Sequence, residues 1–155
     1  MITQEILDLA RAQGMRIATA ESCTGGMVAV ALTDLPGSSK VLERGFVTYS
    51  NEAKKEDLGV SQDSLDSHGA VSEQIACEMA EGALDRSHAD LTISITGIAG
   101  PGASEHKPEG RVCFGLARKG LKTVTETKDF GAQGRTEVRR LSCDYALALL
   151  KRALT

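Results

Sequence analysis

Apolar and polar positions along the chain follow two periods, and these divide the sequence into predicted helices and strands. The first helix has Thr3 as its expected N-cap and ends at Gly14, and its inward-facing residues are Ile6, Leu7, Leu9 and Ala10. Two longer helices are predicted over 73–86 and 135–153, where apolar side chains recur every three or four residues. Each of these helices therefore has one face directed toward a core.

Short apolar runs between the helices predict five strands, over 15–20, 46–49, 91–95, 112–117 and 123–130. The last two are joined across Lys119-Gly120, as in a hairpin. Further helices are expected over 26–34, from Asn51 as a cap to Gly59, and after the capping residue Ser61, while Ser72 is the expected cap of the helix over 73–86. Because helices and strands alternate, the pattern predicts a layered α/β fold with a mixed sheet.

Composition narrows the class of protein. A chain of 155 residues fits one domain, predicted to span residues 1–155. Aromatic residues make up 3% and Trp is absent, which disfavours the stacking platforms of single-stranded nucleic acid binders. The net charge of −3 also disfavours a nucleic acid partner, although a local basic pocket for a small anion is compatible with it.

The cysteine pattern and the apolar runs predict a cytoplasmic protein. The four cysteines are far apart in the sequence and include no C-x-x-C pair, so we expect reduced thiols and neither a disulfide framework nor a zinc site. The N-terminal segment is amphipathic, unlike a signal peptide, and no apolar run is long enough to span a bilayer. We therefore expect no membrane association.

Three loops follow predicted strands and could form a ligand site, since α/β proteins bind ligands at the carboxyl ends of their strands. They are Glu21–Gly26 (ESCTGG), the start of the helix carrying Lys54, and the glycine-rich segment 96–110. Glycines allow a ligand to approach the backbone closely, but neither glycine-rich loop matches a known phosphate-binding fingerprint. Two such loops after buried strands favour a site over a simple connection.

The first loop holds three candidate nucleophiles, Ser22, Cys23 and Thr24. From this loop alone Cys23 is the favoured nucleophile, because a helix N-terminus lowers the pKa of a thiol. A hydroxyl nucleophile would need a base. The chain contains three histidines, His68, His88 and His106, and none is placed as a Ser-His-Asp triad requires.

A lysine is the other possible base, and arginines could bind an anion. Lys54 would need a strongly lowered pKa, and its spacing alone favours a solvated side chain. Arg135 and Arg139 share a helix face, where they could contact a phosphate or simply face solvent.

Five segments, TAESCTGG, GFVTYSNEAK, HGAVS, ISITGIAGPG and KPEGRV, resemble the CinA C-terminal domain family in sequence and order. The resemblance spans almost the whole chain and matches the stand-alone form of the family. It implies a three-layer α/β/α sandwich that acts as a homodimer on a mononucleotide. The implied reaction is hydrolysis of the nicotinamide mononucleotide carboxamide to nicotinate mononucleotide and ammonia.

The resemblance also implies roles for individual residues. Ser22 would be the nucleophile and Lys54 its base, with Tyr49 orienting or protonating and with no metal or cofactor. Backbone N–H groups around Thr24, Gly25 and Gly26 would stabilise the oxyanion. The expected substrate-binding residues are Thr24, Gly25, Gly26, Asn51, Gly97, Gly100, Arg135 and Arg139.

The chain departs from the family pattern in one loop, and two other functions are compatible with the sequence. The segment 102–110 is slightly shorter than usual, and Glu109 stands where a small apolar residue is common. If its carboxylate points inward, it would weaken phosphate binding. The rivals are a non-catalytic, competence-related nucleotide-binding module and a hydrolase that depends on Cys23.

Overall fold

A computed structural model describes all residues, 1–155, and contains one five-stranded sheet. The strands are β1 (Ile17–Glu21), β2 (Leu42–Val47), β3 (Leu91–Gly97), β4 (Arg111–Arg118) and β5 (Val124–Asp129). Their spatial order is β2-β1-β3-β4-β5, with β2, β1 and β3 parallel and with β4 and β5 antiparallel. The predicted mixed sheet and its C-terminal hairpin are confirmed.

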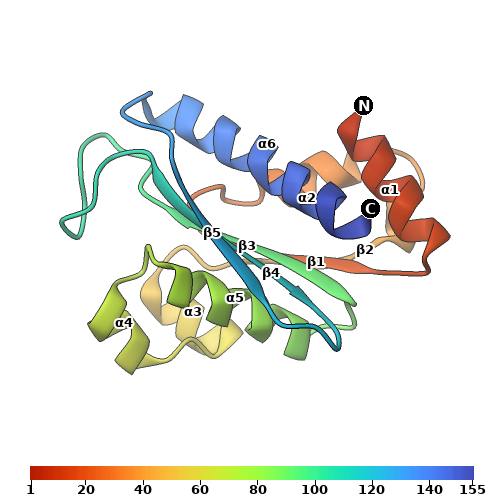
Figure 1. Cartoon of the computed structure of the whole chain (residues 1–155), viewed down its shortest axis with the longest axis horizontal. Coiled ribbons are helices and arrows are strands. Elements are labelled where there is room, and N and C mark those ends of the chain that lie inside the picture. Colours follow the sequence, from red (N-terminus) through yellow and green to blue (C-terminus); the bar gives the residue numbers. More distant parts are fainter.

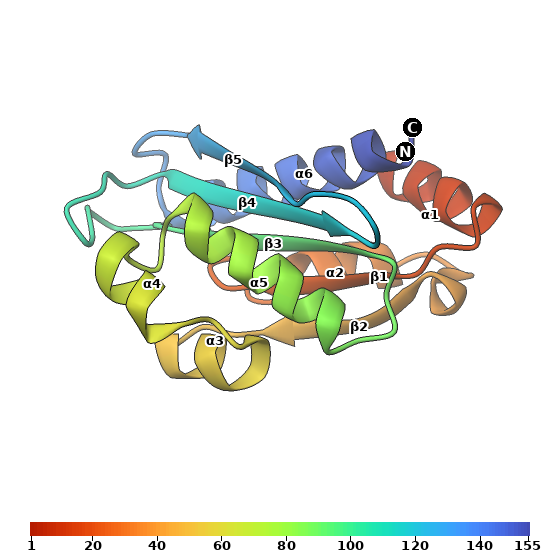
Figure 2. The ribbon, with the colours of Figure 1, turned by 60° about the horizontal axis from the view of Figure 1, so that its bottom comes forward.

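Helices cover both faces of the sheet (Figure 1). On one face lie α1 (Ile2–Ala12), α2 (Met27–Thr33) and α6 (Arg135–Leu154). The other face carries α3 (Asn51–Leu58), α4 (Gln62–His68) and α5 (Glu73–Asp85), and of these α5 crosses in front of the sheet in Figure 2. A short 3-10 helix, η1 (Ser38–Lys40), precedes β2. The predicted three-layer α/β/α arrangement is therefore confirmed.

Aliphatic side chains fill the space on both sides of the sheet. The larger apolar cluster contains 22 buried residues and the smaller one seven, including Ile75, Met79 and Ala83 of the predicted α5 stripe. No helix combines the length and apolar content that crossing a bilayer requires. Both β1 and β3 are buried along almost their whole length. The polar residues that alternate with the apolar ones in β3, Thr92, Ser94 and Thr96, are buried too, and their hydroxyls donate to backbone carbonyls.

Several predicted caps and boundaries differ from the structure. Thr3 is buried within α1 and caps nothing, because the helix already begins at Ile2. Asn51 is the first residue of α3, whose cap is Ser50 with its hydroxyl accepting from the Ala53 N–H. The predicted caps Ser61 and Ser72 are confirmed. Strand β2 begins four residues before its predicted start, in a polar stretch at the sheet edge, and ends at Val47.

The parallel register brings three chain segments to one edge of the sheet. Glu21 at the end of β1 pairs with Val47 of β2 on one side and with Ile95 of β3 on the other. The residues that follow these three strands therefore lie close together, at the end of the sheet where ligands bind in such folds.

Gly82 fixes the distance between α3, which carries Lys54, and α5. A Cβ atom at position 82 would lie 1.9 Å from the Leu58 carbonyl oxygen at the end of α3. The backbone of α3 therefore approaches α5 more closely than any side chain would permit. This contact sets how far α3 stands from the sheet.

We expect Gly82→Ala to destabilise the fold by about 1–3 kcal/mol, as overpacking does. At an open helical site the same change would stabilise by up to about 1 kcal/mol, so the sign of the effect is diagnostic. Urea unfolding measures it, with Gln74→Ala at an exposed position of α5 as the control. A stabilised Gly82→Ala variant would contradict the close approach.

Candidate active site

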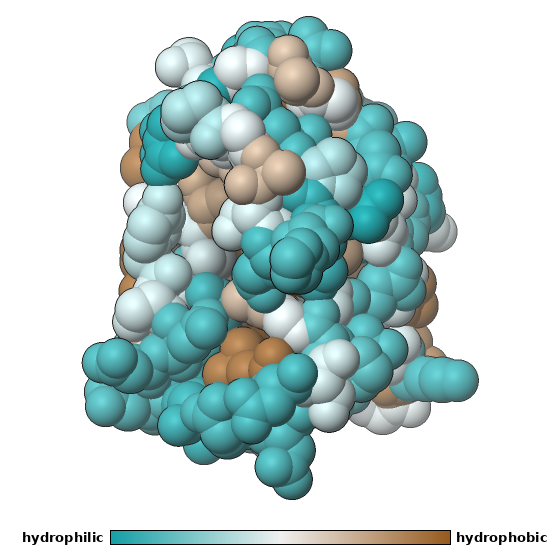
Figure 3. All heavy atoms as spheres, turned by 90° about the vertical axis from the view of Figure 1, so that its left-hand side faces the viewer, coloured by the Kyte–Doolittle hydropathy of each residue, from teal (hydrophilic) through white to brown (hydrophobic).

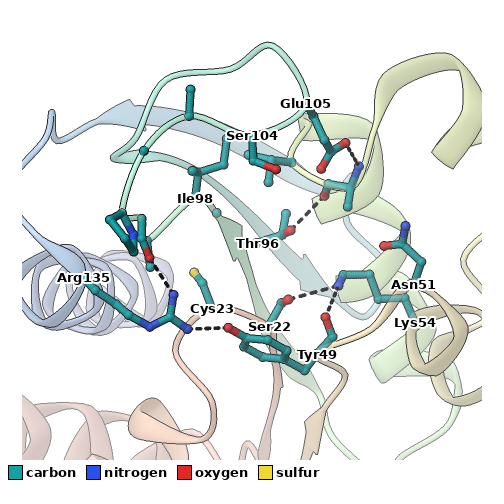
Figure 4. Close-up of a pocket in the computed structure, with 18 residues that line it drawn as sticks. Ser22, Cys23, Tyr49, Asn51, Lys54, Thr96, Ile98, Ser104, Glu105 and Arg135 are labelled. Carbon is teal, nitrogen blue, oxygen red and sulfur yellow. Dashed lines mark hydrogen bonds between the residues drawn. The ribbon is translucent and has the colours of Figure 1, made fainter.

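A cavity of about 460 Å³ opens where the parallel strands end (Figure 4). Residues following all three strands line it, as do the start of α6 and the glycine-rich loop after β3. The surface at this end of the molecule is mainly hydrophilic (Figure 3). The volume of the cavity is in the range of small-molecule binding sites.

Ser22 stands at the tight turn between β1 and α2. Its backbone N–H donates to the Ile95 carbonyl, which continues the β3 pairing by one residue. The preceding Glu21 is fully buried, and its carboxylate accepts from the N–H groups of Gly26, Val28 and Ala29. This carboxylate caps α2 and fixes the turn that presents Ser22 to the cavity.

Lys54 is buried, with 2% of its surface exposed, and its amino group contacts Ser22 directly. Nζ lies 3.0 Å from Ser22 Oγ, 3.1 Å from the Thr48 carbonyl oxygen and 3.3 Å from the Tyr49 carbonyl oxygen. Burial lowers the pKa of Lys54, against smaller opposing effects of Cys23 and Glu105. The prediction from spacing alone, that the Lys54 side chain is solvated, is therefore wrong.

The three contacts suit a neutral amine. A neutral amino group has two N–H donors and one lone pair, and the two carbonyl oxygens can accept only from N–H groups. A protonated Nζ would donate to all three oxygens, Ser22 Oγ included. The neutral amine that burial favours keeps its two N–H groups on the carbonyls and leaves its lone pair for Ser22, whose hydroxyl then donates to Nζ. This is the arrangement that a base needs to take the serine proton.

Cys23 lines the same cavity but is a poor nucleophile. Burial raises the pKa of its thiol to about 12. The predicted lowering by a helix N-terminus is therefore wrong, because removal from water outweighs the helix effect at this position. Of the neighbouring candidates, Ser22 has a base in contact and Cys23 has none.

The structure places Thr24, Gly25 and Gly26 outside the cavity lining, contrary to their expected role as substrate contacts. The N–H of Gly25 donates to the Ser22 carbonyl and that of Gly26 to Glu21, so neither is free for an oxyanion. Thr24 is fully buried. The backbone N–H groups of Cys23 and Thr24, by contrast, donate to no other residue.

The two candidate arginines differ in position. Arg139 lies outside the cavity lining and donates to the carbonyls of Cys23 and Thr24, so it holds the nucleophile turn against α6. Arg135 lines the cavity, donating from Nη1 to the Gly100 carbonyl at 2.7 Å and from Nη2 to the Tyr49 hydroxyl at 2.5 Å. Of the two, only Arg135 is placed to meet an anion in the cavity.

Tyr49 closes one side of the cavity, with its ring exposed and its hydroxyl on Arg135 (Figure 4). Its backbone carbonyl, not its side chain, contacts Lys54. Asn51 also lines the cavity, and its side chain makes no hydrogen bond within the chain. Gly97 and Gly100 line the cavity too, as expected.

Two glutamates hold the glycine-rich loop after β3, and only one of them lines the cavity. Glu109 accepts from the N–H groups of Gly102 and Gly134, and it is not among the cavity-lining residues. The acid that does line the cavity is Glu105, which accepts from the Ala70 N–H at 3.0 Å. The backbone of Glu105 has a φ of 53°, in the left-handed region, and nothing in the sequence indicated this conformation.

Comparison with known proteins identifies relatives along the whole chain. Residues 1–154 match the family model for the CinA C-terminal domain. Nicotinamide-nucleotide amidohydrolase PncC of Escherichia coli K12 is 48% identical over 150 residues, which cover 96% of this chain and 90% of that protein. A CinA-like protein of Chlorobium phaeobacteroides is 49% identical, but the chain spans only 35% of its length.

Solved structures share the fold. The competence/damage inducible protein CihA of Agrobacterium tumefaciens superposes with a TM-score of 0.88 at 45% identity, covering 97% of this chain and 95% of that one. The competence damage-inducible protein A of Klebsiella pneumoniae has a TM-score of 0.94 at 38% identity, covering 99% and 94%.

The lowered pKa of Lys54 predicts a specific dependence of stability on pH. Between that pKa and the ordinary value near 10.5, the folded protein holds a neutral amine while the unfolded chain is protonated. The unfolded state then binds more protons, so the free energy of unfolding rises with pH, approaching about 1.4 kcal/mol per pH unit. Urea unfolding at a series of pH values should show this slope for Lys54 as the difference between the protein and Lys54→Met, because the cysteine thiols, whose pKa values are raised, add an opposite slope to both proteins.

Lys54→Met should remove that slope, whatever its effect on stability at one pH. Lys55→Met, at an exposed position of the same helix, is the control and should retain it. Equal slopes in the unsubstituted protein and in both variants would mean that the pKa of Lys54 is not lowered.

The raised pKa of Cys23 predicts an unreactive thiol. At pH 8 a pKa of about 12 leaves about one thiol in ten thousand ionised, and the thiolate is the reactive form. Alkylation of the folded protein with iodoacetamide, followed by peptide mass spectrometry, should modify half-buried Cys77 well before Cys23. Faster labelling of Cys23 than of Cys77 would contradict this prediction and favour Cys23 as the nucleophile.

Proposed function

The chain belongs to the CinA C-terminal domain family, and from that premise we propose that it hydrolyses nicotinamide mononucleotide to nicotinate mononucleotide and ammonia. The name of the Escherichia coli relative, which is matched over nearly its whole length, supports this substrate. The single structural observation that carries the proposal is the buried contact between Ser22 and Lys54 inside the cavity.

The first half of the reaction forms an ester on Ser22. Neutral Lys54 takes the hydroxyl proton as Ser22 Oγ attacks the carboxamide carbon. The carbonyl oxygen becomes an oxyanion, and we assign the unpartnered N–H group of Cys23, which lines the cavity, as its donor. Lys54 then returns the proton to the amide nitrogen, the C–N bond breaks and ammonia leaves.

The second half releases the acid. Lys54, neutral again, takes a proton from a water molecule that attacks the ester carbon. The ester bond to Ser22 Oγ breaks, and the serine oxygen recovers a proton from Lys54. The two carbonyl oxygens of Thr48 and Tyr49 hold Nζ in place through both halves.

Arg135 and Tyr49 are proposed to bind the mononucleotide. The guanidinium of Arg135 is the only arginine group in the cavity lining, and a phosphate is the ligand that a planar guanidinium recognises best. The Tyr49 hydroxyl contacts Arg135 and not Ser22, which favours an orienting role over proton transfer.

We propose a cytoplasmic location, supported by four free cysteine thiols. The predicted homodimer stays a prediction.

Ammonia release from nicotinamide mononucleotide tests the function directly. We expect Ser22→Ala to lower kcat by more than about 10³-fold, as loss of a nucleophile does in serine hydrolases. Cys23→Ala is the matched control at the next position and should keep most of the rate.

Two outcomes would contradict the proposal. Binding of the mononucleotide without ammonia release would favour the non-catalytic nucleotide-binding module. An inactive Cys23→Ala variant beside an active Ser22→Ala variant would favour the cysteine-dependent hydrolase.

A further inference from the structure

Two of the residues that line the cavity carry charge, Glu105 and Arg135, beside the neutral amine of Lys54. Lys54 is engaged with Ser22, whereas Glu105 and Arg135 lie on opposite sides of the cavity (Figure 4). The cavity therefore has a negative side and a positive side, with the nucleophile below and between them. A ligand with two opposite charges would fit it in one orientation only.

We propose that Glu105 selects a cationic ring, so that the cavity takes a zwitterionic mononucleotide with its ring toward Glu105 and its phosphate toward Arg135. This inference rests on the proposed function and names the property of the substrate that the site recognises. In nicotinamide mononucleotide the ring nitrogen is bonded to ribose and is quaternary, so the ring carries a positive charge. That charge lies on the same ring as the reactive carboxamide.

Glu105 is free to act on a ligand. Its Oε2 accepts from the Ala70 N–H at 3.0 Å, its Oε1 makes no hydrogen bond, and the side chain takes part in no ion pair. Its backbone is positioned by the paired Ser104 and Lys107, which exchange two backbone hydrogen bonds, and by Lys107 Nζ, which donates to the His68 carbonyl at 2.6 Å. The carboxylate is thus fixed in place with no ion pair of its own, although it and Lys107 Nζ both lie beside Gly69.

The same charge distinguishes substrate from product. Hydrolysis replaces the neutral carboxamide by a carboxylate on the ring, so the product carries one more negative charge than the substrate. A fixed carboxylate in the wall attracts the cationic ring of the substrate and repels the new carboxylate. Glu105 would therefore favour release of the product.

Binding of two ligands that differ in ring charge tests the proposal. In a Ser22→Ala background, which prevents turnover, calorimetry gives the dissociation constants of nicotinamide mononucleotide and of its 1,4-dihydro form. Both carry the same phosphate and carboxamide, but the dihydro ring is neutral. We expect tighter binding of the cationic ligand, and Glu105→Gln should reduce this preference by up to about fivefold, the upper end of the range for a solvent-exposed charge pair.

Glu105→Gln retains an oxygen acceptor for the Ala70 N–H, so a purely structural role would change both dissociation constants alike. The matched control is Glu52→Gln, which removes an acidic charge from the exposed first turn of α3, outside the cavity lining. This control should leave the preference unchanged.

An unchanged preference in Glu105→Gln, an equal loss in Glu52→Gln, or binding of neither ligand would overturn the inference. Ammonia release by the unsubstituted protein is a separate readout. If ammonia is released but Glu105→Gln leaves the ligand preference unchanged, only the charge-selection proposal is rejected. If Glu105→Gln reduces the preference but no ammonia is released, only the proposed amidohydrolase activity is rejected.

Discussion

The active site depends on the burial of one amino group. Lys54 can be buried because two carbonyl oxygens and a serine hydroxyl satisfy Nζ, and because burial favours the neutral form that those partners fit. The same removal from water raises the pKa of the neighbouring Cys23 thiol. One physical effect therefore activates the serine and silences the cysteine beside it.

The rest of the fold holds the partners of this amine in register. Parallel pairing of β2, β1 and β3 brings the turn after β1 beside the turn after β2. Glu21 fixes the first turn from inside by capping α2, and Arg139 fixes it from α6. The close contact between Gly82 and Leu58 places the helix that carries Lys54. Each layer of the sandwich thus contributes one restraint.

The sequence predicted the architecture well, because apolar periods and capping serines report directly on local structure. It did not predict the state of Lys54 from the residues alone, since burial of a side chain in a short polar helix depends on distant strands; the family resemblance supplied that residue. It placed Thr24, Gly25, Gly26 and Arg139 at the substrate, whereas the structure uses them to build the turn. The lining role of Glu105 and the position of Glu109 outside the cavity lining depend on loop geometry that no spacing rule encodes.

The two oxygen atoms that hold Lys54 belong to the main chain at positions 48 and 49. Every amino acid has a carbonyl group, so these contacts survive substitution of either side chain as long as the backbone path is kept. Across relatives, selection on this part of the site would act on the length and shape of the turn, not on residue identity. Insertions and deletions between β2 and α3 would then be more informative about loss of activity than substitutions there.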